Sequence, residues 1–495
     1  MTDLRSGAGQ ERGQADGRHP PITRRQRNFP LPPMGSAILS PELSIEAVRD
    51  YDAFRALHPG VPAPAKEADM GHAAAGLDDL TAFLGRLTAL LLRSSGEGAY
   101  SIERAVGASA QAFGGQASVV LVPEAAVLSI TAADGRVRTV CVHGFPEVFR
   151  LDQAAALKPF LADVKTGRLG VAEANRRLAR IEAAPPPYPW WLKFLGVLLF
   201  SLGFAPLVQP TWYEITTTAV LGSIAAALVV AAVYAPRLSK ILPLMVSAVV
   251  SVVTIEVFTS DPAHGGPVLL MLPALFYFVP GDFLSASTTE LAVGLVTTGA
   301  IRLVYSVFLL VQLYLGVLMG IFVTGTPLNT LFDTAAKADL PKWALILGGI
   351  AFTAGTVLAF AIPHRFFGTL LVLVYATVGV QSLFTKLIRE TGGTFVAAVV
   401  LAAAANLLDR NPAFPPRLIL ILPGFFTLTV GSLGLRGLTT LAGGYVIEGF
   451  QDLQKLITIV TAIAIGLVVG MALTHARTTT RPTSPHAPST SHRPP

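Results

Sequence analysis

Val268–Gly281 (VLLMLPALFYFVPG) and Leu418–Gly431 (LILILPGFFTLTVG) are two versions of one apolar segment, displaced by 150 residues. They align without a gap and share two leucines, a proline, a phenylalanine and the final glycine. The matched pairs are Leu270 and Leu420, Leu272 and Leu422, Pro273 and Pro423, Phe276 and Phe426, and Gly281 and Gly431. The same displacement pairs residues outside the segment, for example Gly320 with Gly470. A duplicated membrane unit that contains helix breakers is typical of secondary transporters.

The composition places much of this chain in lipid. Of the 495 residues, 52% are hydrophobic and 14% are charged, whereas soluble domains carry about 25% charged residues. The net charge of +6 is explained by surplus Lys and Arg in cytoplasmic tails and loops, so we expect no nucleic-acid partner. Cys141 is the single cysteine, which excludes an internal disulfide framework and a multi-cysteine metal site. We expect no metal and no cofactor.

Most charged residues precede the first long apolar run, which divides the chain into a soluble part and a membrane part. Residues 1–42 and 475–495 are polar tails that we expect to be disordered, and no signal peptide is expected. Residues 43–186 are predicted to form a soluble cytoplasmic α+β domain. The membrane part is predicted to comprise two five-helix repeats, residues 187–325 and residues 326–474.

Within the soluble domain the hydrophobic period changes from helical to alternating and back. Helices are expected at 77–92, 101–113, 152–165 and 171–183, and strands at 117–122, 126–132 and 136–142. Asp134-Gly135 is the expected hairpin turn between the last two strands. Trp190 and Trp191 fit an interfacial belt where the chain enters the membrane.

The apolar runs beyond residue 187 indicate ten spans of about 17–21 residues each. They are expected at 190–208, 215–235, 241–258, 267–285, 303–324, 342–362, 365–385, 392–408, 417–435 and 455–474. Because five is odd, two consecutive five-span repeats must enter the membrane from opposite sides. The predicted fold class is therefore a multi-span α-helical membrane protein with two inverted five-helix repeats and an N-terminal cytoplasmic α+β domain.

Basic residues set the expected orientation in the membrane. In the first half, Arg237, Lys240 and Arg302 follow the second and fourth spans, whereas the loops after the first and third spans hold no Lys or Arg. By the positive-inside rule, the N-terminal domain is expected in the cytoplasm, and ten spans return the C-terminus there. In the second half, basic residues occur on both sides and do not decide the orientation.

Helix breakers interrupt the fourth and ninth spans at corresponding positions. Because proline removes an amide donor, the freed carbonyls need partners in protein or in a water-filled cavity. Exposed carbonyls suit an ammonium group and a free helix N-terminus suits a carboxylate, which together fit a zwitterionic amino acid. The predicted substrate-binding residues are Pro280, Gly281, Asp282, Gly431, Ser432 and Gly434. A short in-plane or re-entrant helix is expected after each break, at 287–301 and 437–450. The alternative is that these prolines are ordinary kinks packed against neighbouring helices.

Ionisable residues in the spans are the candidate coupling residues, because a charge at the centre of a span costs about 2.5–3.5 kcal/mol. Glu256, near the end of the third span, is a candidate proton carrier. Arg302 is a candidate partner for the substrate or for an acid. The alternatives are an interfacial acid at Glu256 and a positive-inside anchor at Arg302. The repeat displacement pairs Glu256 with Asn406, so one half carries a carboxylate where the other carries an amide.

Several of these stretches resemble the threonine/serine exporter family of bacterial membrane proteins. Val279-Pro280-Gly281 is similar to the family's Val-Pro-Gly, and residues 431–437 (GSLGLRG) resemble its Gly-Ser-Leu-Gly-aromatic-Arg-Gly run. Residues 90–104 and 151–189 resemble the helix junction and the helix pair of its soluble domain. The departures from the family pattern are Asp282-Phe283-Leu284-Ser285, Val430 and Ser101. The resemblance implies ten spans, an N-terminal soluble domain, and export of threonine or serine across the bacterial plasma membrane, driven by the membrane potential or proton gradient.

Two other functions compete with transport. A membrane-tethered hydrolase would use Cys141 and His143, which share one face of a predicted strand, as nucleophile and base. No third orienting residue is evident in the sequence, and it contains neither a His-Glu-x-x-His zinc motif nor a Gly-rich Lys-Ser/Thr phosphate loop. A regulatory or oligomerisation role is the remaining interpretation of the soluble domain. We therefore expect a transporter and not an enzyme, with an amino acid and the lipid bilayer as partners and homo-oligomerisation left open.

Overall fold

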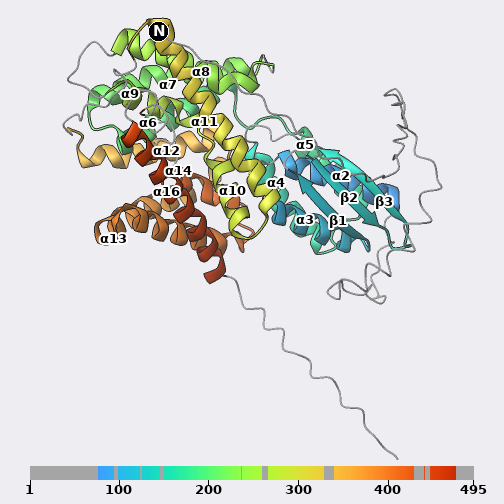
Figure 1. The fold of residues 1–495 in the computed structure, drawn as a ribbon. Coiled ribbons are helices and arrows are strands. Elements are labelled where there is room, and N and C mark those ends of the chain that lie inside the picture. Colours follow the sequence, from blue (N-terminus) through green and yellow to red (C-terminus); the bar gives the residue numbers. More distant parts are fainter. Residues whose placement is uncertain are drawn as a thin grey trace, which may run out of the picture. The chain divides into compact units, whose positions relative to one another are not determined.

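The computed structural model describes residues 76–93, 98–122, 125–144, 150–235, 237–258, 266–327, 339–428, 440 and 446–474, without the side chains of Asp282, Ser285, Val446 and Ile447. The described residues are mainly helical and include a three-stranded sheet (Figure 1). Both predicted disordered tails, 1–42 and 475–495, lie outside the described residues.

The segment before the first long apolar helix forms a small sheet with helices. Its elements are α2 (Leu77–Arg93), α3 (Ala99–Ala112), β1 (Gln116–Val122), β2 (Ala125–Thr131), β3 (Val137–His143), α4 (Leu151–Lys165) and α5 (Val171–Ala183). The strands pair antiparallel in the order β1-β2-β3, so that Leu128 lies between Val119 and Val140. The predicted turn joins β2 to β3, and its Gly135 has a φ of 82°, which glycine adopts without steric cost.

The core of this segment lies between the sheet and its helices (Figure 1). Leu80 and Leu84 of α2 are fully buried, as the helical spacing of its leucines predicts. Leu128 and Ile130 alternate along β2 and pack into the same core as Phe160 of α4. Burial of side chains of this size contributes about 1.5–3 kcal/mol each. Hydrophobic periodicity thus accounts for the local fold of this segment.

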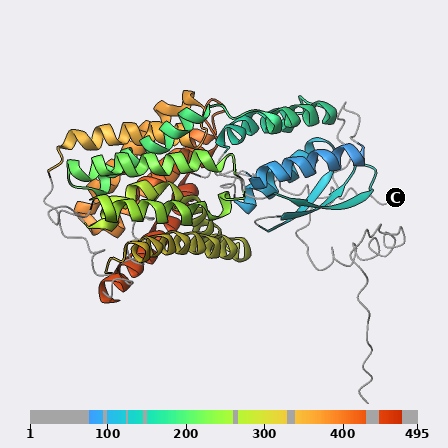
Figure 2. The ribbon, with the colours of Figure 1, turned by 90° about the horizontal axis from the view of Figure 1, so that it is seen from above.

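The remaining described residues form the membrane part, whose long helices lie side by side in Figure 2. Its elements are α6 (Trp190–Val208), α7 (Trp212–Ala232), η2 (Ser239–Ile241), α8 (Leu242–Val253), η3 (Thr254–Phe258), α9 (Pro267–Leu275), η4 (Phe276–Phe278), α10 (Gly281–Ala292), α11 (Val296–Thr324), α12 (Lys342–Ala359), η6 (His364–Phe366), α13 (Phe367–Asp409), α14 (Arg417–Thr427) and α16 (Val446–Leu473). Seven helical segments among the described residues are long and apolar enough to cross a membrane. The chain is a multi-pass membrane protein.

Six of these segments correspond to one predicted span each. The other four predicted spans differ from the prediction. The spans predicted at 365–385 and 392–408 form one helical segment, His364–Asp409, in which the backbone leaves the helical region at Ile388 and Arg389. The spans predicted at 267–285 and 417–435 are instead the short apolar helices Pro267–Phe278 and Arg417–Thr427. Both short helices contain a proline and stop before the full predicted length.

The short helix predicted at 287–301 is placed differently by the structure. α10 begins earlier, directly after Pro280, and ends at Ala292, whereas residues from Val296 onward belong to α11. The separation is made by Gly294, whose φ of 87° is left-handed and interrupts the helix. The corresponding prediction at 437–450 lies mostly outside the described residues, and its described end, from Val446 onward, belongs to α16.

Helix boundaries and close contacts both follow the repeat displacement. α9 begins at Pro267 and α14 begins 150 residues later, at Arg417. In each half a pair of glycines packs one helix onto another without room for a side chain. These contacts are Gly316 on Ser247, Gly320 on Ser251, Gly466 on Ala398 and Gly470 on Ala402. Small residues spaced four apart allow the close backbone approach that holds membrane helices together.

Candidate functional site

The first predicted break lies between η4 and α10. Val279 is extended, the amide of Gly281 donates to the Val279 carbonyl over 2.7 Å, and α10 begins at Gly281 with Pro280 as its N-cap. Asp282 follows in the first turn of α10, although its side chain lies outside the described set. The first-turn amides of a helix lack partners within that helix and carry partial positive charge. The break therefore presents a helix N-terminus inside the membrane part.

This break packs against α14, the helix that precedes the second break. A Cβ atom added at Gly281 would lie 2.8 Å from the Phe426 ring and 3.1 Å from the Phe425 ring, so the contact requires glycine. Phe426 also contacts Phe276, its counterpart in the repeat, with ring centroids 5.7 Å apart. Two positions that are equivalent by the displacement therefore touch beside the first break. The predicted residues of the second break, Gly431, Ser432 and Gly434, lie outside the described residues.

Aromatic rings from both halves surround this contact. Phe200 of α6 lies 5.4 Å from Phe426, and Phe360, the C-cap of α12, stacks on Phe426 at 5.8 Å. Phe204 of α6 stacks on Phe276. These rings are almost completely buried. We call Phe200, Phe204, Phe276, Tyr277, Phe360 and Phe426 the aromatic cluster. A polar group placed in such an apolar region needs a hydrogen-bond partner there.

Pro273, which lies inside α9, frees a carbonyl whose partner sequence reasoning missed. Proline has no amide to bond the carbonyl of Leu269, four residues earlier. The side-chain amide of Gln209 donates to that carbonyl over 2.9 Å, and the Thr218 hydroxyl donates to the Gln209 side-chain oxygen over 2.9 Å. Gln209 is only 2% exposed. Its position beside Pro210 at the end of a span suggests a loop residue, so the sequence carries little signal for this role.

The two predicted coupling residues have different environments. Glu256 lies on η3, a single turn of π-helix that follows α8. Its side chain is exposed and is not covered by the rest of the described protein. Arg302 on α11 is 8% exposed, and its Nε lies 3.5 Å from the carboxylate of Glu290 on α10. The structure thus pairs Arg302 with an acid, one of the two partners proposed for it from the sequence.

Glu290 is a buried acid that the sequence prediction did not include. It is 3% exposed, and its Oε1 accepts a hydrogen bond from the amide of Ala99 over 3.0 Å. Ala99 is the first residue of α3, so the carboxylate lies at the positive end of that helix. The same carboxylate thus contacts both α11 and the helix–sheet segment. Its position on a short helix predicted to lie in the membrane plane gave no reason to expect such a partner.

Cys141 and His143, the residues of the hydrolase alternative, lie on β3 with Sγ and Nδ1 3.9 Å apart. Both side chains are exposed, and the shared strand face follows from their spacing. A nucleophile–base pair needs an orienting third group and a site that holds a substrate. An open strand face provides neither, so the structure does not support the hydrolase alternative.

Comparison with known proteins identifies part of the chain. Residues 82–324 match the family model of threonine/serine exporters, designated ThrE. The match runs from within α2 to the last residue of α11, and so includes the Val279-Pro280-Gly281 break. The comparisons with curated proteins and with solved structures give no match. The family match therefore likens residues 82–324 of this multi-pass membrane protein to threonine/serine exporters.

Proposed function

We propose that the chain is a secondary active transporter that exports threonine or serine across the bacterial plasma membrane and is coupled to the proton-motive force. The family match supports export of these amino acids. The observation that carries the proposal is the contact between Phe276 and Phe426, repeat-equivalent residues that meet beside the Gly281 break. Substrate sites of transporters with internal repeats lie where the repeats meet at broken helices.

The proposed architecture is ten passes in two inverted repeats, residues 187–325 and 326–474. The matching starts of α9 and α14 support it, as does the break at Ile388 and Arg389, which divides the long His364–Asp409 segment into two span lengths. In this arrangement the helix–sheet segment and both termini are cytoplasmic.

Single-cysteine labelling tests this orientation, because Cys141 is the only native cysteine. In a Cys141→Ala background, one cysteine is placed in the 237–240 loop and another in the 386–389 segment. Inverted repeats require that a membrane-impermeant thiol reagent reach these two positions from opposite sides. Labelling from a common side would reject the inversion and the transport mechanism built on it.

The proposed substrate site comprises Pro280, Gly281 and Asp282 of the first break, and Gly431, Ser432 and Gly434 by repeat correspondence. The N-terminus of α10 is suited to the substrate carboxylate, and carbonyls freed at the breaks are suited to its ammonium group. Counterflow of labelled threonine into liposomes that contain the purified chain is the direct test. Competition by unlabelled amino acids then defines the substrate class.

Gly281→Ala tests the site within that assay. The new methyl group would meet the Phe426 ring, so the break and the substrate contacts are expected to shift and counterflow to fall. Gly379→Ala is the matched control, because no atom lies within 4 Å of a Cβ added at that glycine of α13. Equal counterflow in the two variants would remove Gly281 from the proposed site.

Glu256 and Arg302 are the proposed coupling residues. The π-helical turn at Glu256 supports this role, since such turns occur often at functional sites. Glu256→Gln is expected to abolish flux driven by a proton gradient while preserving counterflow, which needs no net proton movement. Gradient-driven flux that persists unchanged would assign Glu256 to the membrane interface instead. For Arg302, the buried contact with Glu290 supports a role as the partner of an acid.

For the helix–sheet segment we propose a role in regulation or oligomerisation. Its contact from Ala99 to Glu290 on α10 supports regulation, because α10 begins at the first break. The oligomeric state is measured by mass photometry or light scattering of the purified chain in detergent.

A further inference from the structure

Tyr277 lies in η4, between Pro273 and the Pro280-Gly281 break. Its ring stacks on Phe360 with centroids 5.5 Å apart and lies edge-on to Phe200 at 6.2 Å. Phe200 belongs to α6 of the first half, and Phe360 caps α12 of the second half. The ring is therefore held between the two halves, at the place where the proposed transport mechanism requires the substrate.

The hydroxyl of Tyr277 has no hydrogen-bond partner among the described residues, although the residue is only 7% exposed. Three other tyrosines differ in this respect. The hydroxyls of Tyr188, Tyr213 and Tyr375 donate to the carbonyls of Ile362, Phe258 and Ile346 over 2.7, 2.9 and 2.5 Å. A buried hydroxyl without a partner is unfavourable, and phenylalanine would fill the same ring space without that penalty. The Tyr277 hydroxyl would therefore be stabilised by a hydrogen-bond partner, and the described residues do not provide one.

We propose that the Tyr277 hydroxyl forms a hydrogen bond with the side-chain hydroxyl of the transported amino acid. This inference rests on the proposed function and names the group that would select hydroxy amino acids within it. A phenol hydroxyl both donates and accepts a hydrogen bond, as does the hydroxyl of threonine or serine. A site that bonds a substrate hydroxyl rejects analogues without it, because the polar group of the site is then left unpaired. Tyr277 therefore favours threonine over valine, which has a similar shape but no hydroxyl.

Tyr277→Phe tests the proposal because it keeps the ring contacts and removes only the hydroxyl. The full chain and the variant are reconstituted in liposomes, and counterflow of labelled threonine is competed with unlabelled threonine or valine. The apparent affinity of the variant for threonine is expected to fall about tenfold or more, while its affinity for valine stays the same or improves. Tyr213→Phe is the matched control. It removes a hydroxyl that bonds a backbone carbonyl, and the ratio of threonine to valine affinity is expected to stay at the wild-type value.

If the ratio of the apparent affinities for threonine and valine is the same in Tyr277→Phe as in the wild type, the proposal is overturned. Thermal unfolding in detergent supplies a readout that needs no transport. Because the hydroxyl has no described protein partner, the variant is expected to unfold at the wild-type temperature or above it. A lower unfolding temperature would mean that the protein itself bonds the hydroxyl, and would also overturn the proposal. Failure of the wild type to exchange threonine or serine would instead reject the proposed function, and the two failures are therefore distinguishable.

Discussion

The ammonium group of Lys158 lies 2.9 Å from the carboxylate of Asp409, which is 251 residues away in the chain. The same group lies within 3.3 Å of four backbone carbonyl oxygens at the end of α13 and before α14, those of Asp409, Asn411, Phe414 and Pro415, which share its three N–H donors. These carbonyls precede α14, the helix whose Phe426 contacts Gly281. Lys158 thus joins α4 to the connection that leads into α14.

α4 also shares its apolar residues between two cores. Leu151 and Ala154 pack into the core of the membrane part, whereas Leu157 and Phe160 pack into the core of the helix–sheet segment.

Lys158→Ala removes the charged donor from the Asp409 connection and leaves several carbonyls without it. We expect the unfolding free energy of the full chain to fall by about 1.5–3 kcal/mol, as for hydrogen bonds to charged groups.

Lys165→Ala is the control for that measurement, since Lys165 is an exposed lysine on the same helix. Its effect is expected to stay within about 0.5 kcal/mol. Denaturant unfolding in detergent, followed by tryptophan fluorescence, compares the two variants. Equal effects would mean that the Lys158 contacts contribute no net stability.

Gln209 and Pro273 are expected to be energetically coupled. Gln209→Leu leaves the Leu269 carbonyl and the Thr218 hydroxyl without their partner, which is expected to cost about 1–3 kcal/mol. Pro273→Ala restores the backbone amide that a regular helix would direct to Leu269. In the double variant, part of the lost stability should therefore return. A double-mutant cycle of unfolding free energies measures this coupling, and strictly additive effects would show that the two residues act independently.

Gly316 is expected to tolerate no side chain. A Cβ atom there would meet the Ser247 hydroxyl and lie 2.6 Å from the Leu244 carbonyl, so that α11 and α8 would have to separate. Gly316→Val should therefore lower the unfolding free energy by about 1–3 kcal/mol or more. Gly379→Val places the same side chain where nothing lies within 4 Å and should be close to neutral. Comparable thermal stability of the two variants would contradict the close packing of α8 and α11.

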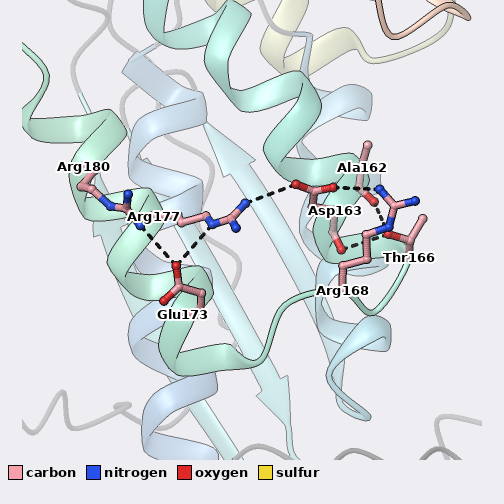
Figure 3. A network of polar contacts seen from close by, with 7 residues as sticks. All are labelled: Ala162, Asp163, Thr166, Arg168, Glu173, Arg177 and Arg180. Atoms are coloured by element: carbon pink, nitrogen blue, oxygen red, sulfur yellow. Dashed lines mark hydrogen bonds and ion pairs between the residues drawn. The ribbon is translucent and has the colours of Figure 1, made fainter.

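The helix–sheet segment is expected to lose an electrostatic contribution at acidic pH. Glu173 accepts hydrogen bonds from Arg177 and Arg180 (Figure 3). The Arg176 guanidinium beside Glu173 holds the pKa of that carboxyl below its ordinary value of 4.5. Because the folded-state pKa is depressed, the stabilisation is present above the unfolded-state pKa and is lost as the pH falls through the folded-state pKa.

Glu173→Gln should accordingly lower the unfolding temperature slightly at about pH 7 and lower it less at about pH 3. The effect is small because this network is exposed to solvent. Differential scanning fluorimetry at both pH values measures it. A difference of the same size at both would attribute the effect to packing and not to charge.

Much of the local structure could be read from the sequence alone. The boundaries predicted for α5 (171–183) and α6 (190–208) agree with the observed ones, because hydrophobic period and proline positions act on neighbouring residues. The same local rules placed the break at Pro280 and Gly281. They did not place the end of α10, where the left-handed Gly294 competes with a continuous apolar pattern.

Partners distant in the chain were decided by the tertiary structure. Each of these pairs depends on how separately formed helices pack, so no periodic pattern in the sequence indicates it. The pairs are Glu290 with Ala99, Gln209 with Leu269, and Lys158 with Asp409. The amino-acid sequence by itself determined which of the described segments are helical and where the first break lies. Which buried polar groups meet was decided by packing, because a polar atom removed from water binds whichever complementary atom the neighbouring helix brings within reach.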